Sequence, residues 1–349
     1  MAEAPTAVSR GLVDAASLGP YLGERLGAQF ERFAVSRLGE GQSCLTFQLD
    51  GEGWSMVLRR PPRGDLPPSA FDVTREFRVI SALREAGSDV PLPRPILLCE
   101  DETVIGAPFY AMEPVPGLVI RETVPELISA AAAERLGLDL LDVLAAIHAV
   151  DWRAAGLEGF GNSGAYAERQ LGRMTKLWQR ARFRELPEVE ELGAWLEANR
   201  PPASESTIVH GDYKLDNVIV APDGRVRAVV DWELSTIGDP LADLGWLTYY
   251  WIDDEAEVEW PRMPAASLAA GFPDRAQLLA RYGERRPAPV ETVRWYAALA
   301  GWKTAVMLEG SYRRYVEGNS DIAQHALLEQ GVPFLARRGL GFAVGELAL

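Results

Sequence analysis

The sequence predicts a bilobal α+β fold, in which an antiparallel sheet with one main helix precedes a larger, mostly helical lobe. Two patterns support this prediction. Residues 1–112 contain short strand-like runs between turns and one helix-like stretch, whereas residues 118–349 mostly repeat apolar side chains at helical spacing. The segment Glu113-Pro114-Val115-Pro116-Gly117 interrupts both patterns and is expected to be a hinge at 113–117. A chain of 349 residues suits two such lobes.

The first lobe is expected to contain strands and one clear helix. The strands are predicted at residues 33–38, 45–49, 54–59, 96–99 and 109–112. Asp50-Gly51-Glu52-Gly53 is typical of a hairpin turn, and Pro61-Pro62 ends the third strand. Apolar residues at helical spacing predict a helix at Phe71–Glu85, which Gly87 ends.

The second lobe is expected to consist of long helices around a few short strands. Helices are predicted at residues 130–148, 166–183, 189–198, 241–250, 275–282 and 290–316. Short strands are predicted at residues 208–209, 218–220 and 226–230. The strands border two polar clusters, so the clusters are expected at strand ends.

Composition narrows the classes of function. With 48% hydrophobic and 24% charged residues, the chain is an ordinary globular protein with a sizeable core. The net charge of −15 argues against a nucleic-acid partner, and fits either solubility or a cationic substrate. Cys44 and Cys99 alone do not make a disulfide scaffold, and neither a secretion signal nor a membrane-spanning stretch is visible. We therefore expect a cytoplasmic monomer or homodimer without a membrane partner.

Two apolar runs each end in a polar cluster. The first cluster is His210-Gly211-Asp212-Tyr213-Lys214-Leu215-Asp216-Asn217, and the second begins with Asp231-Trp232-Glu233. Phosphoryl transfer from a nucleotide needs an aspartate that accepts a hydroxyl proton, oxygen ligands for Mg²⁺ and a cation for the moving phosphoryl group. The two clusters together contain all of these groups. The sequence therefore predicts a protein that phosphorylates a small molecule.

Each of these residues has an expected role and a structural alternative. Asp212 is the expected catalytic base, and the alternative is a surface turn residue after a strand. Asn217 and Asp231 are the expected Mg²⁺ ligands, because Mg²⁺ prefers oxygen ligands and shares them with phosphates; the alternative is that both are caps. Lys214 is expected to contact the phosphoryl group, and the alternative is a solvated loop lysine. His210 is expected to be structural.

A glycine-rich turn and a basic strand end add to this picture. The glycines of the turn Gly39-Glu40-Gly41-Gln42-Ser43 let backbone N–H groups approach phosphates, although it also fits a plain hairpin. Strand alternation places Arg59 on the same face as Val57.

In this order the motifs resemble the protein-kinase-like fold, in the form found in the aminoglycoside phosphotransferase and choline kinase families. The resemblance covers nearly the whole chain and implies Mg²⁺ as cofactor and ATP as phosphate donor, with GTP as an alternative. It assigns nucleotide binding to the turn and the hinge, at Gly41, Gln42, Ser43, Met112, Glu113 and Val115. Kinases place a phosphate-binding lysine where this chain has Arg59. If Val57 lines the nucleotide pocket, the resemblance implies that Arg59 takes the place of that lysine and can bind phosphate bidentately. It also implies that Glu76, in the predicted helix, is the partner of that cation; the alternative is that Glu76 belongs to a solvated face. In the segment Gly238–Gly245, the family resemblance implies that Asp243 supports the catalytic loop.

The acceptor is less constrained. An acidic, aromatic stretch that contains Trp251 and Asp253 suits an amine-bearing acceptor, or is a solvated loop. Further candidates for acceptor contacts, each with a structural alternative, are Glu233, Trp302, Glu309 and Arg313. The segments 58–62, 231–234 and 311–315 resemble the branch whose phosphotransferase domains lie beside acyl-CoA dehydrogenase domains. That resemblance favours a hydroxy acid or hydroxyacyl-CoA over an antibiotic as acceptor.

Three hypotheses follow from the sequence. The leading one is a Mg·ATP-dependent kinase that acts on a small-molecule hydroxyl group, which the intact set of Asp212, Asn217 and Asp231 supports. The alternatives are a nucleotide-binding sensor or scaffold with little turnover, suggested by Arg59, and an aminoglycoside or amino-alcohol kinase. A protein kinase is disfavoured, because Gly211 replaces the arginine that reads a phosphorylated activation segment.

Overall fold

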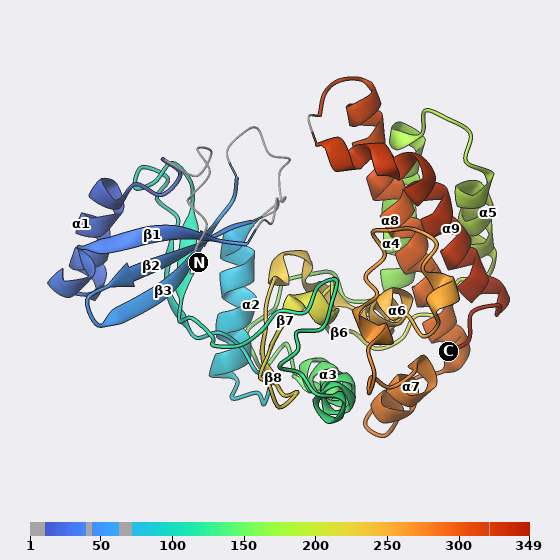
Figure 1. Cartoon of the computed structure of the whole chain (residues 1–349), viewed down its shortest axis with the longest axis horizontal. Coiled ribbons are helices and arrows are strands. Elements are labelled where there is room, and N and C mark those ends of the chain that lie inside the picture. Colours follow the sequence, from blue (N-terminus) through green and yellow to red (C-terminus); the bar gives the residue numbers. More distant parts are fainter. Residues whose placement is uncertain (1–10, 40–43, 63–71, 321) are drawn as a thin grey trace. The chain divides into compact units, whose positions relative to one another are not determined.

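A computed structural model describes residues 11–39, 44–62, 72–320 and 322–349 (Figure 1). The chain divides into two compact units. The first unit comprises Met1–Gly87, Pro91–Pro116 and Ala228–Glu233, and the second comprises Ser88–Val90, Gly117–Arg227 and Leu234–Leu349. The chain thus returns to the first unit for a short segment that contains Asp231.

A five-stranded antiparallel sheet forms the centre of the first unit, with strand order β1-β2-β3-β5-β4. The strands are β1 Phe33–Leu38, β2 Leu45–Gly51, β3 Trp54–Arg60, β4 Pro95–Cys99 and β5 Phe109–Met112. The predicted hairpin between β2 and β3 is confirmed, since Gly51 pairs with Trp54 and Gly53 has a φ of +77°. Glycine adopts that φ without a steric penalty, so the turn residues fit the register.

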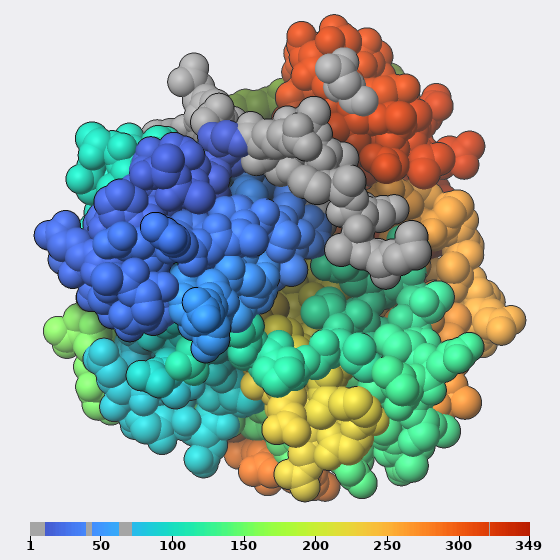
Figure 2. All heavy atoms as spheres, turned by 60° about the vertical axis from the view of Figure 1, so that its left-hand side comes forward, coloured from blue at the N-terminus to red at the C-terminus, as the bar shows by residue number. Residues whose placement is uncertain are grey.

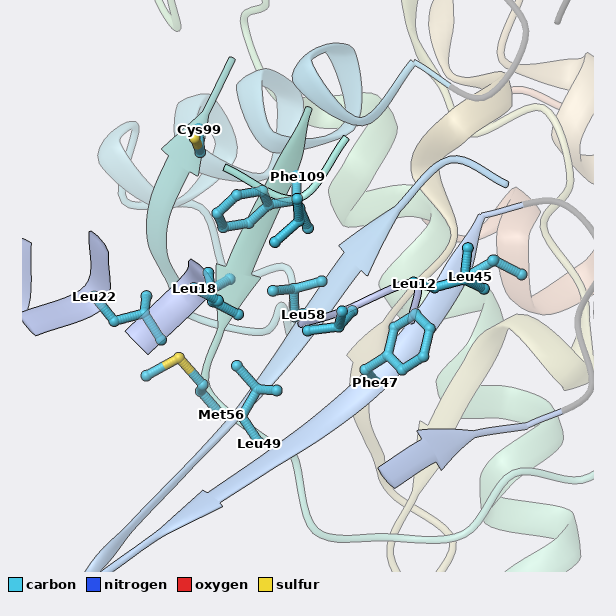
Figure 3. Close-up of a cluster of buried hydrophobic side chains, with 13 residues drawn as sticks. Leu12, Leu18, Leu22, Leu45, Phe47, Leu49, Met56, Leu58, Cys99 and Phe109 are labelled. Carbon is cyan, nitrogen blue, oxygen red and sulfur yellow. The ribbon is translucent and has the colours of Figure 1, made fainter. Parts of the chain in front are cut away.

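The core of the first unit lies between the sheet and helix α1, Ala15–Leu26 (Figure 3). Leu18 and Leu22 of α1 are fully buried with Leu49 of β2 and Leu58 of β3. Each such side chain stabilises the fold by roughly 1.5–3 kcal/mol relative to an exposed one. Figure 2 turns this unit toward the viewer, with its N-terminal part in blue.

Helix α2, Val73–Glu85, packs against β4 and β5 and confirms the predicted helix. It begins at Asp72, whose side chain accepts hydrogen bonds from the backbone N–H groups of Thr74 and Arg75, as an N-cap does. Its buried face is apolar except for Glu76, which is 1% exposed. A carboxylate on a buried face requires a partner, and β3 supplies it.

The second unit is mainly helical. Its helices are α3 Ala130–Ala149, α4 Tyr166–Ala181, α5 Pro187–Ala198, α6 Leu241–Tyr250, α7 Arg275–Gly283, α8 Val290–Val316 and α9 Leu328–Val344. Helix α8 contacts α4, α5, α6 and α9 and is therefore central. It approaches α9 closely, because a Cβ added to Gly301 would lie 3.0 Å from Gly339 Cα.

Short strands lie near the polar loops. β6, Thr207–Val209, pairs with β9, Thr236–Gly238, and β7, Val218–Val220, pairs with β8, Val226–Val229. The loop with the first polar cluster therefore starts at the end of β6 and leads into β7. Among the described residues, no helix is both long and apolar enough to cross a membrane.

Candidate active site

The loop after β6 is held in place by a carboxylate of α6. Asp243 is fully buried and accepts hydrogen bonds from the backbone N–H groups of His210 at 2.7 Å and Gly211 at 2.8 Å. Gly211 has a φ of +88°, and a Cβ there would lie 2.6 Å from Leu234 O. Only glycine fits this position. Asp243 thus supports the loop as expected, and His210, also fully buried, accepts the N–H of Asp212 at 3.3 Å.

The carboxylate of Asp212 accepts hydrogen bonds from two neutral donors and can accept a further one. Its Oδ1 accepts from Trp246 Nε1 at 2.8 Å and its Oδ2 from Asn217 Nδ2 at 2.7 Å. A carboxylate offers about four acceptor positions, and 22% of this side chain is exposed. Burial raises the pKa of the Asp212 carboxyl, against the opposing effect of Lys214. A partly exposed carboxylate with a raised pKa can accept a proton from a hydroxyl group.

Lys214 is an ammonium bound by two carboxylates. Its Nζ lies 2.7 and 2.8 Å from the two oxygens of Asp216 and 3.4 Å from Asp212 Oδ2. Burial favours the neutral amine, but Asp212 and Asp216 outweigh it and raise the pKa of Lys214, so this residue is charged at neutral pH. Asp216 is therefore part of the loop's own ion pairing, and a phosphoryl group near Lys214 would compete with it.

Asn217 has its amide hydrogens fixed and its oxygen available. Nδ2 donates to the backbone O of Asp212 at 2.8 Å as well as to its carboxylate. No described residue donates a hydrogen bond to Asn217 Oδ1, although the residue is only 7% exposed. An amide oxygen is a ligand type that Mg²⁺ accepts. Asn217 therefore has the chemistry expected of a metal ligand.

In the first unit, Arg59 joins two carboxylates. Its Nε lies 3.0 Å from Glu76 Oε2, and its Nη2 lies 2.9 Å from Asp231 Oδ1. The Arg59 side chain is 9% exposed and that of Glu76 is 1% exposed. Although burial acts against the charge, Glu76 and then Tyr110 and Asp231 raise the pKa of Arg59 further above its usual value. The expected pairing of Arg59 with Glu76 is therefore present.

Asp231 adopts a backbone conformation that L-residues seldom adopt. Its φ is +66°, and the next backbone N–H, that of Trp232, donates to Glu76 Oε1 at 3.1 Å. Such a conformation costs about 1–3 kcal/mol and is often found at functional sites. Asp231 Oδ2 accepts no hydrogen bond from a described residue, and 27% of the side chain is exposed. This carboxylate therefore keeps one oxygen for a further partner.

A magnesium site built on these residues would not be a cluster of acids. Within the described ranges, no group of three or more His, Cys, Asp and Glu side chains is arranged to hold a metal ion. Mg²⁺ in phosphate-transfer sites uses one or two protein oxygens together with substrate phosphates and water. Asn217 in the second unit and Asp231 in the first each have one oxygen available for such a role.

Glu233 has a carboxyl group with a strongly raised pKa. Burial, and then the charges of Asp231 and Glu76, raise its pKa to about 7. Its Oε2 is buried and has no hydrogen-bond partner among the described residues. Burial likewise raises the pKa of the Cys44 thiol, which makes that thiol unreactive. Glu233 thus lies in the first unit with the expected nucleotide residues.

Within the described part of the chain, the hinge has one backbone donor and one backbone acceptor without a backbone partner. The N–H of Glu113 donates to Arg94 O at 2.8 Å, and Met112 pairs with Val57 in the sheet. In the part of the chain that is described, neither the carbonyl of Glu113 nor the N–H of Val115 has a backbone partner. The expected phosphate contacts of the glycine-rich turn concern Gly41, Gln42 and Ser43, which lie outside the described residues.

Comparison with known proteins places this geometry in a family. The sequence matches the phosphotransferase enzyme family over residues 34–290. The chain belongs to this family. Human acyl-CoA dehydrogenase family member 11 is 35% identical over 342 residues, covering 94% of this chain and 43% of the human protein. The chain thus spans less than half the length of such curated relatives, and the expected resemblance to this branch is confirmed.

Solved structures confirm the fold of this phosphotransferase-family protein. A Ralstonia eutropha protein provisionally described as an aminoglycoside phosphotransferase is 34% identical, covers 95% of this chain and 98% of its own, and has a TM-score of 0.80. A thermostable mutant of aminoglycoside phosphotransferase APH(4)-Ia, in ternary complex with AMP-PNP and hygromycin B, is 18% identical with a TM-score of 0.61. The latter covers 95% of this chain and 99% of its own, and shares the fold.

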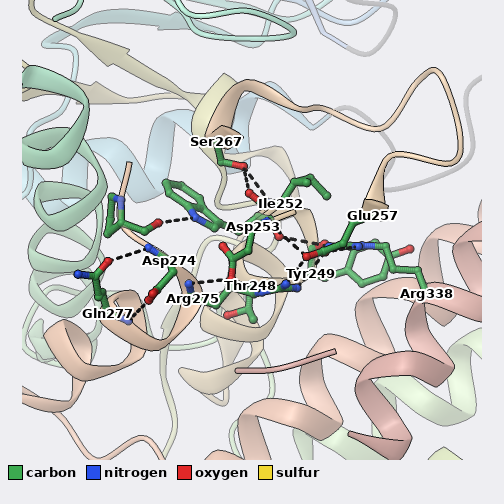
Figure 4. Close-up of polar contacts among 12 residues, drawn as sticks. Thr248, Tyr249, Ile252, Asp253, Glu257, Ser267, Asp274, Arg275, Gln277 and Arg338 are labelled. Carbon is green, nitrogen blue, oxygen red and sulfur yellow. Dashed lines mark hydrogen bonds and ion pairs between the residues drawn. The ribbon is translucent and has the colours of Figure 1, made fainter. Parts of the chain in front are cut away.

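Two acids of the stretch after α6, Asp253 and Glu257, belong to an internal ion network (Figure 4). Asp253 Oδ2 accepts from Arg275 Nε at 2.9 Å, and Glu257 binds both Arg275 and, at 2.6 Å, Arg338. The two arginine side chains are 4% and 2% exposed. Asp253 therefore has a structural partner, and the structure does not favour the acceptor contact expected for it.

The two tryptophans expected near the acceptor are core residues. Trp251 is 1% exposed and its Nε1 donates to Pro273 O at 2.9 Å. Trp302 is 3% exposed and its Nε1 donates to Val189 O at 2.9 Å. With the ring buried and the only polar atom bonded, neither side chain is available to an acceptor.

Glu309 and Arg313 also have structural partners. Glu309 is fully buried and its Oε2 lies 2.9 Å from Nη2 of Arg184. Arg313 pairs with Glu317 at 2.7 Å and donates to Arg180 O at 3.0 Å. The structure therefore favours the structural alternative for both residues.

Two residues beside Asp212 were not expected there. Trp246 bonds Asp212 directly, and Lys303 of α8 has its Nζ 4.9 Å from the centroid of the Trp246 ring. No sequence pattern links these positions to Asp212. The available signal was the scarcity of lysine, because Lys303 is one of only three in the chain.

Proposed function

We propose that this protein transfers the γ-phosphoryl group of ATP, in the presence of Mg²⁺, to a hydroxyl group of a small molecule. The observation that supports this most is the carboxylate of Asp212. It is partly exposed, oriented by Trp246 and Asn217, and retains acceptor capacity. A group with these properties accepts the hydroxyl proton and orients the oxygen for in-line attack.

Asn217 and Asp231 are the proposed ligands of Mg²⁺. Each keeps one side-chain oxygen without a described donor, and each is fixed by its other contacts. When bound, Mg²⁺ offsets the negative charge of the nucleotide phosphates. Lys214, charged because of its two carboxylate neighbours, is the proposed cation for the transferring phosphoryl group.

The first unit is the proposed nucleotide-binding part. Arg59 is the proposed phosphate-binding cation, with Glu76 as its partner, and the turn with Gly41, Gln42 and Ser43 is proposed to contact the phosphates. The carbonyl of Glu113 and the N–H of Val115 match the donor–acceptor edge of adenine, and equally that of guanine. These two groups therefore do not distinguish ATP from GTP. AMP-PNP in the APH(4)-Ia complex favours ATP as the donor.

A hydroxy acid or hydroxyacyl-CoA is the proposed acceptor. The likeness to acyl-CoA dehydrogenase family member 11 supports this class. An amine-bearing acceptor, such as hygromycin B in the APH(4)-Ia complex, would need available carboxylates. Two acids of the stretch suited to that role, Asp253 and Glu257, are instead paired with Arg275 and Arg338. The proposed location is the cytoplasm.

The decisive test of the proposal is the substitution Asp212→Asn. We expect it to lower kcat by about a hundredfold or more, the scale of losing a general base, and to change nucleotide affinity only a few-fold. Phosphate transfer from labelled ATP to a panel of hydroxy acids, their CoA esters and amino alcohols measures this. Asp223→Asn, in an exposed turn, is the matched control and should behave as wild type. Near wild-type turnover in Asp212→Asn would refute the role of Asp212.

A second test addresses the metal. Asp231→Ala removes the carboxylate oxygen proposed for Mg²⁺, so Mg²⁺-dependent ATP binding should be lost while Mg²⁺-independent binding remains. Calorimetric titration with ATP, with and without Mg²⁺, separates the two. Asp223→Ala is the control for the loss of one carboxylate. Unchanged Mg²⁺-dependent binding in Asp231→Ala would contradict the metal assignment.

A further inference from the structure

Lys303 carries a charge that nothing in the described part of the chain neutralises by direct contact. Its Nζ lies over the ring of Trp246, 4.9 Å from the centroid, and no described carboxylate lies within ion-pair distance of it. The residue is partly exposed on α8. A cation over an indole gains about 0.5–2 kcal/mol, which is less than an ion pair with a hydrogen bond supplies in a buried setting.

Lys303 is also close to the expected catalytic base. The indole under its ammonium is the one whose Nε1 donates to Asp212 Oδ1 at 2.8 Å. One tryptophan side chain therefore separates the ammonium of Lys303 from the carboxylate of Asp212. A small molecule whose hydroxyl group lies at Asp212 would have its other end within reach of Lys303 after a few carbon atoms.

The charges around Lys303 come from three other segments. Burial lowers its pKa to about 8, and Arg173 of α4 acts in the same direction, while Asp212 of the loop and Asp243 of α6 oppose this. Asp243 is already bound to the backbone of the loop, and Asp212 to Trp246 and Asn217. Arg173 is itself exposed, and no described residue forms an ion pair with it. Lys303 and Arg173 are thus two cations close enough to interact, and neither has an ion-pair partner among the described residues.

We propose that Lys303 binds an anionic group of the acceptor, a carboxylate or the equivalent charged end of a hydroxy acid, and so selects acceptors by charge. This inference rests on the proposed function and adds the residue that recognises the acceptor. An anion at Lys303 completes an ion pair that the protein leaves open, and Arg173 adds a second attraction. An ammonium-bearing acceptor meets two like charges and is disfavoured.

The experiment compares each of several straight-chain hydroxy acids with its own primary amide, which differs only in charge. Wild type should prefer the acid. Lys303→Met should raise KM for the acids roughly tenfold or more and leave KM for the amides and kcat nearly unchanged, because only the charge-assisted contact is lost. Lys303→Arg should restore the preference. Lys176→Met, at an exposed lysine of α4, is the matched control and should keep wild-type values.

The pH dependence gives an independent readout. Since the pKa of Lys303 is lowered to about 8, its charge is lost as pH rises through that value. The preference for acids should therefore decline above pH 8 in wild type, and persist in Lys303→Arg, whose guanidinium stays charged. Thermal unfolding of each variant checks folding, which the loss of a half-buried charge is expected to leave intact.

The outcomes separate the inference from the proposed function. If wild type phosphorylates acids and amides equally, or Lys303→Met lowers kcat equally for both, the inference is overturned while the kinase function stands. If no hydroxyl compound is phosphorylated, the proposed function fails. Calorimetric titration of the same hydroxy acids then decides the inference alone: binding that Lys303→Met abolishes and Lys303→Arg retains supports it, and no binding overturns it.

Discussion

Two clusters of charged residues in the second unit differ in how completely their charges are paired. One cluster consists of Asp253, Glu257, Arg275 and Arg338. Its arginines and Glu257 are nearly inaccessible, and every charge in it has a partner of opposite sign. The other cluster consists of Asp212, Lys214, Asp216 and Lys303. There Asp212 stays 22% exposed with unused acceptor capacity, and Lys303 has no acid partner among the described residues.

The difference separates structural charges from functional ones. Placing a charge in a low-dielectric environment costs several kcal/mol. A well-formed ion pair with further hydrogen bonds offsets this cost. The Glu257 cluster meets that condition within the protein itself. The Asp212 cluster does not, and the resulting pKa shifts of Asp212 and Lys303 mark groups that await a partner. Incomplete pairing beside an oriented carboxylate therefore indicates a functional site.

We call the fully paired cluster of Asp253, Glu257, Arg275 and Arg338 the closed cluster, and the cluster of Asp212, Lys214, Asp216 and Lys303 the open cluster. The comparison predicts that the closed cluster contributes more to the free energy of unfolding. Glu257→Gln keeps the volume of the side chain but leaves Arg338 without its carboxylate and Arg275 with Asp253 only. Breaking a buried pair in this way typically costs about 3–5 kcal/mol, because an uncompensated charge stays buried. Urea unfolding, followed by far-UV circular dichroism, should show that loss.

Asp212→Asn is the matched carboxyl-to-amide change in the open cluster. Loss of the buried charge favours folding, while an amide group facing two donors loses a hydrogen bond, so the net change should stay below about 1.5 kcal/mol. If both variants lost the same free energy of unfolding, the distinction between the clusters would not hold.

The sequence predicted most elements of both units but not the first and last helices of the chain. Helix α1 contains Pro20 and two glycines, and α9 contains Pro333 and three glycines, and these residues argue against a helix in isolation. Some of these residues allow close packing between helices, which no local sequence pattern reveals. Gly339 of α9, for example, allows the close approach to Gly301 of α8. Tertiary contacts therefore stabilise helices that propensity alone disfavours.

The loop chemistry was predictable because its residues are close together in the sequence, whereas the acceptor side was not. Asp212, Lys214 and Asn217 lie within one loop, so their spacing identifies them. The acidity of the stretch with Asp253 suggested a binding surface, but the arginine that pairs with Asp253 lies 22 residues further along the chain. Partners so distant in sequence are found only by folding, and the same holds for Lys303.

The first unit offers a smaller, sharper test of the same distinction. Arg59 is mostly buried like the arginines of the closed cluster, yet one of its partners, Asp231, keeps an oxygen available. Arg59→Lys can preserve the pair with Glu76 but has no planar head to reach Asp231 at the same time. We expect activity to stay within about tenfold of wild type, the scale of one lost hydrogen bond, with a higher KM for ATP. Steady-state kinetics at varied ATP measure this, and Arg37→Lys, on an outer strand, is the control. An inactive Arg59→Lys variant would mean that the guanidinium bridge is itself required, and that Arg59 belongs with the open, functional charges rather than with the structural ones.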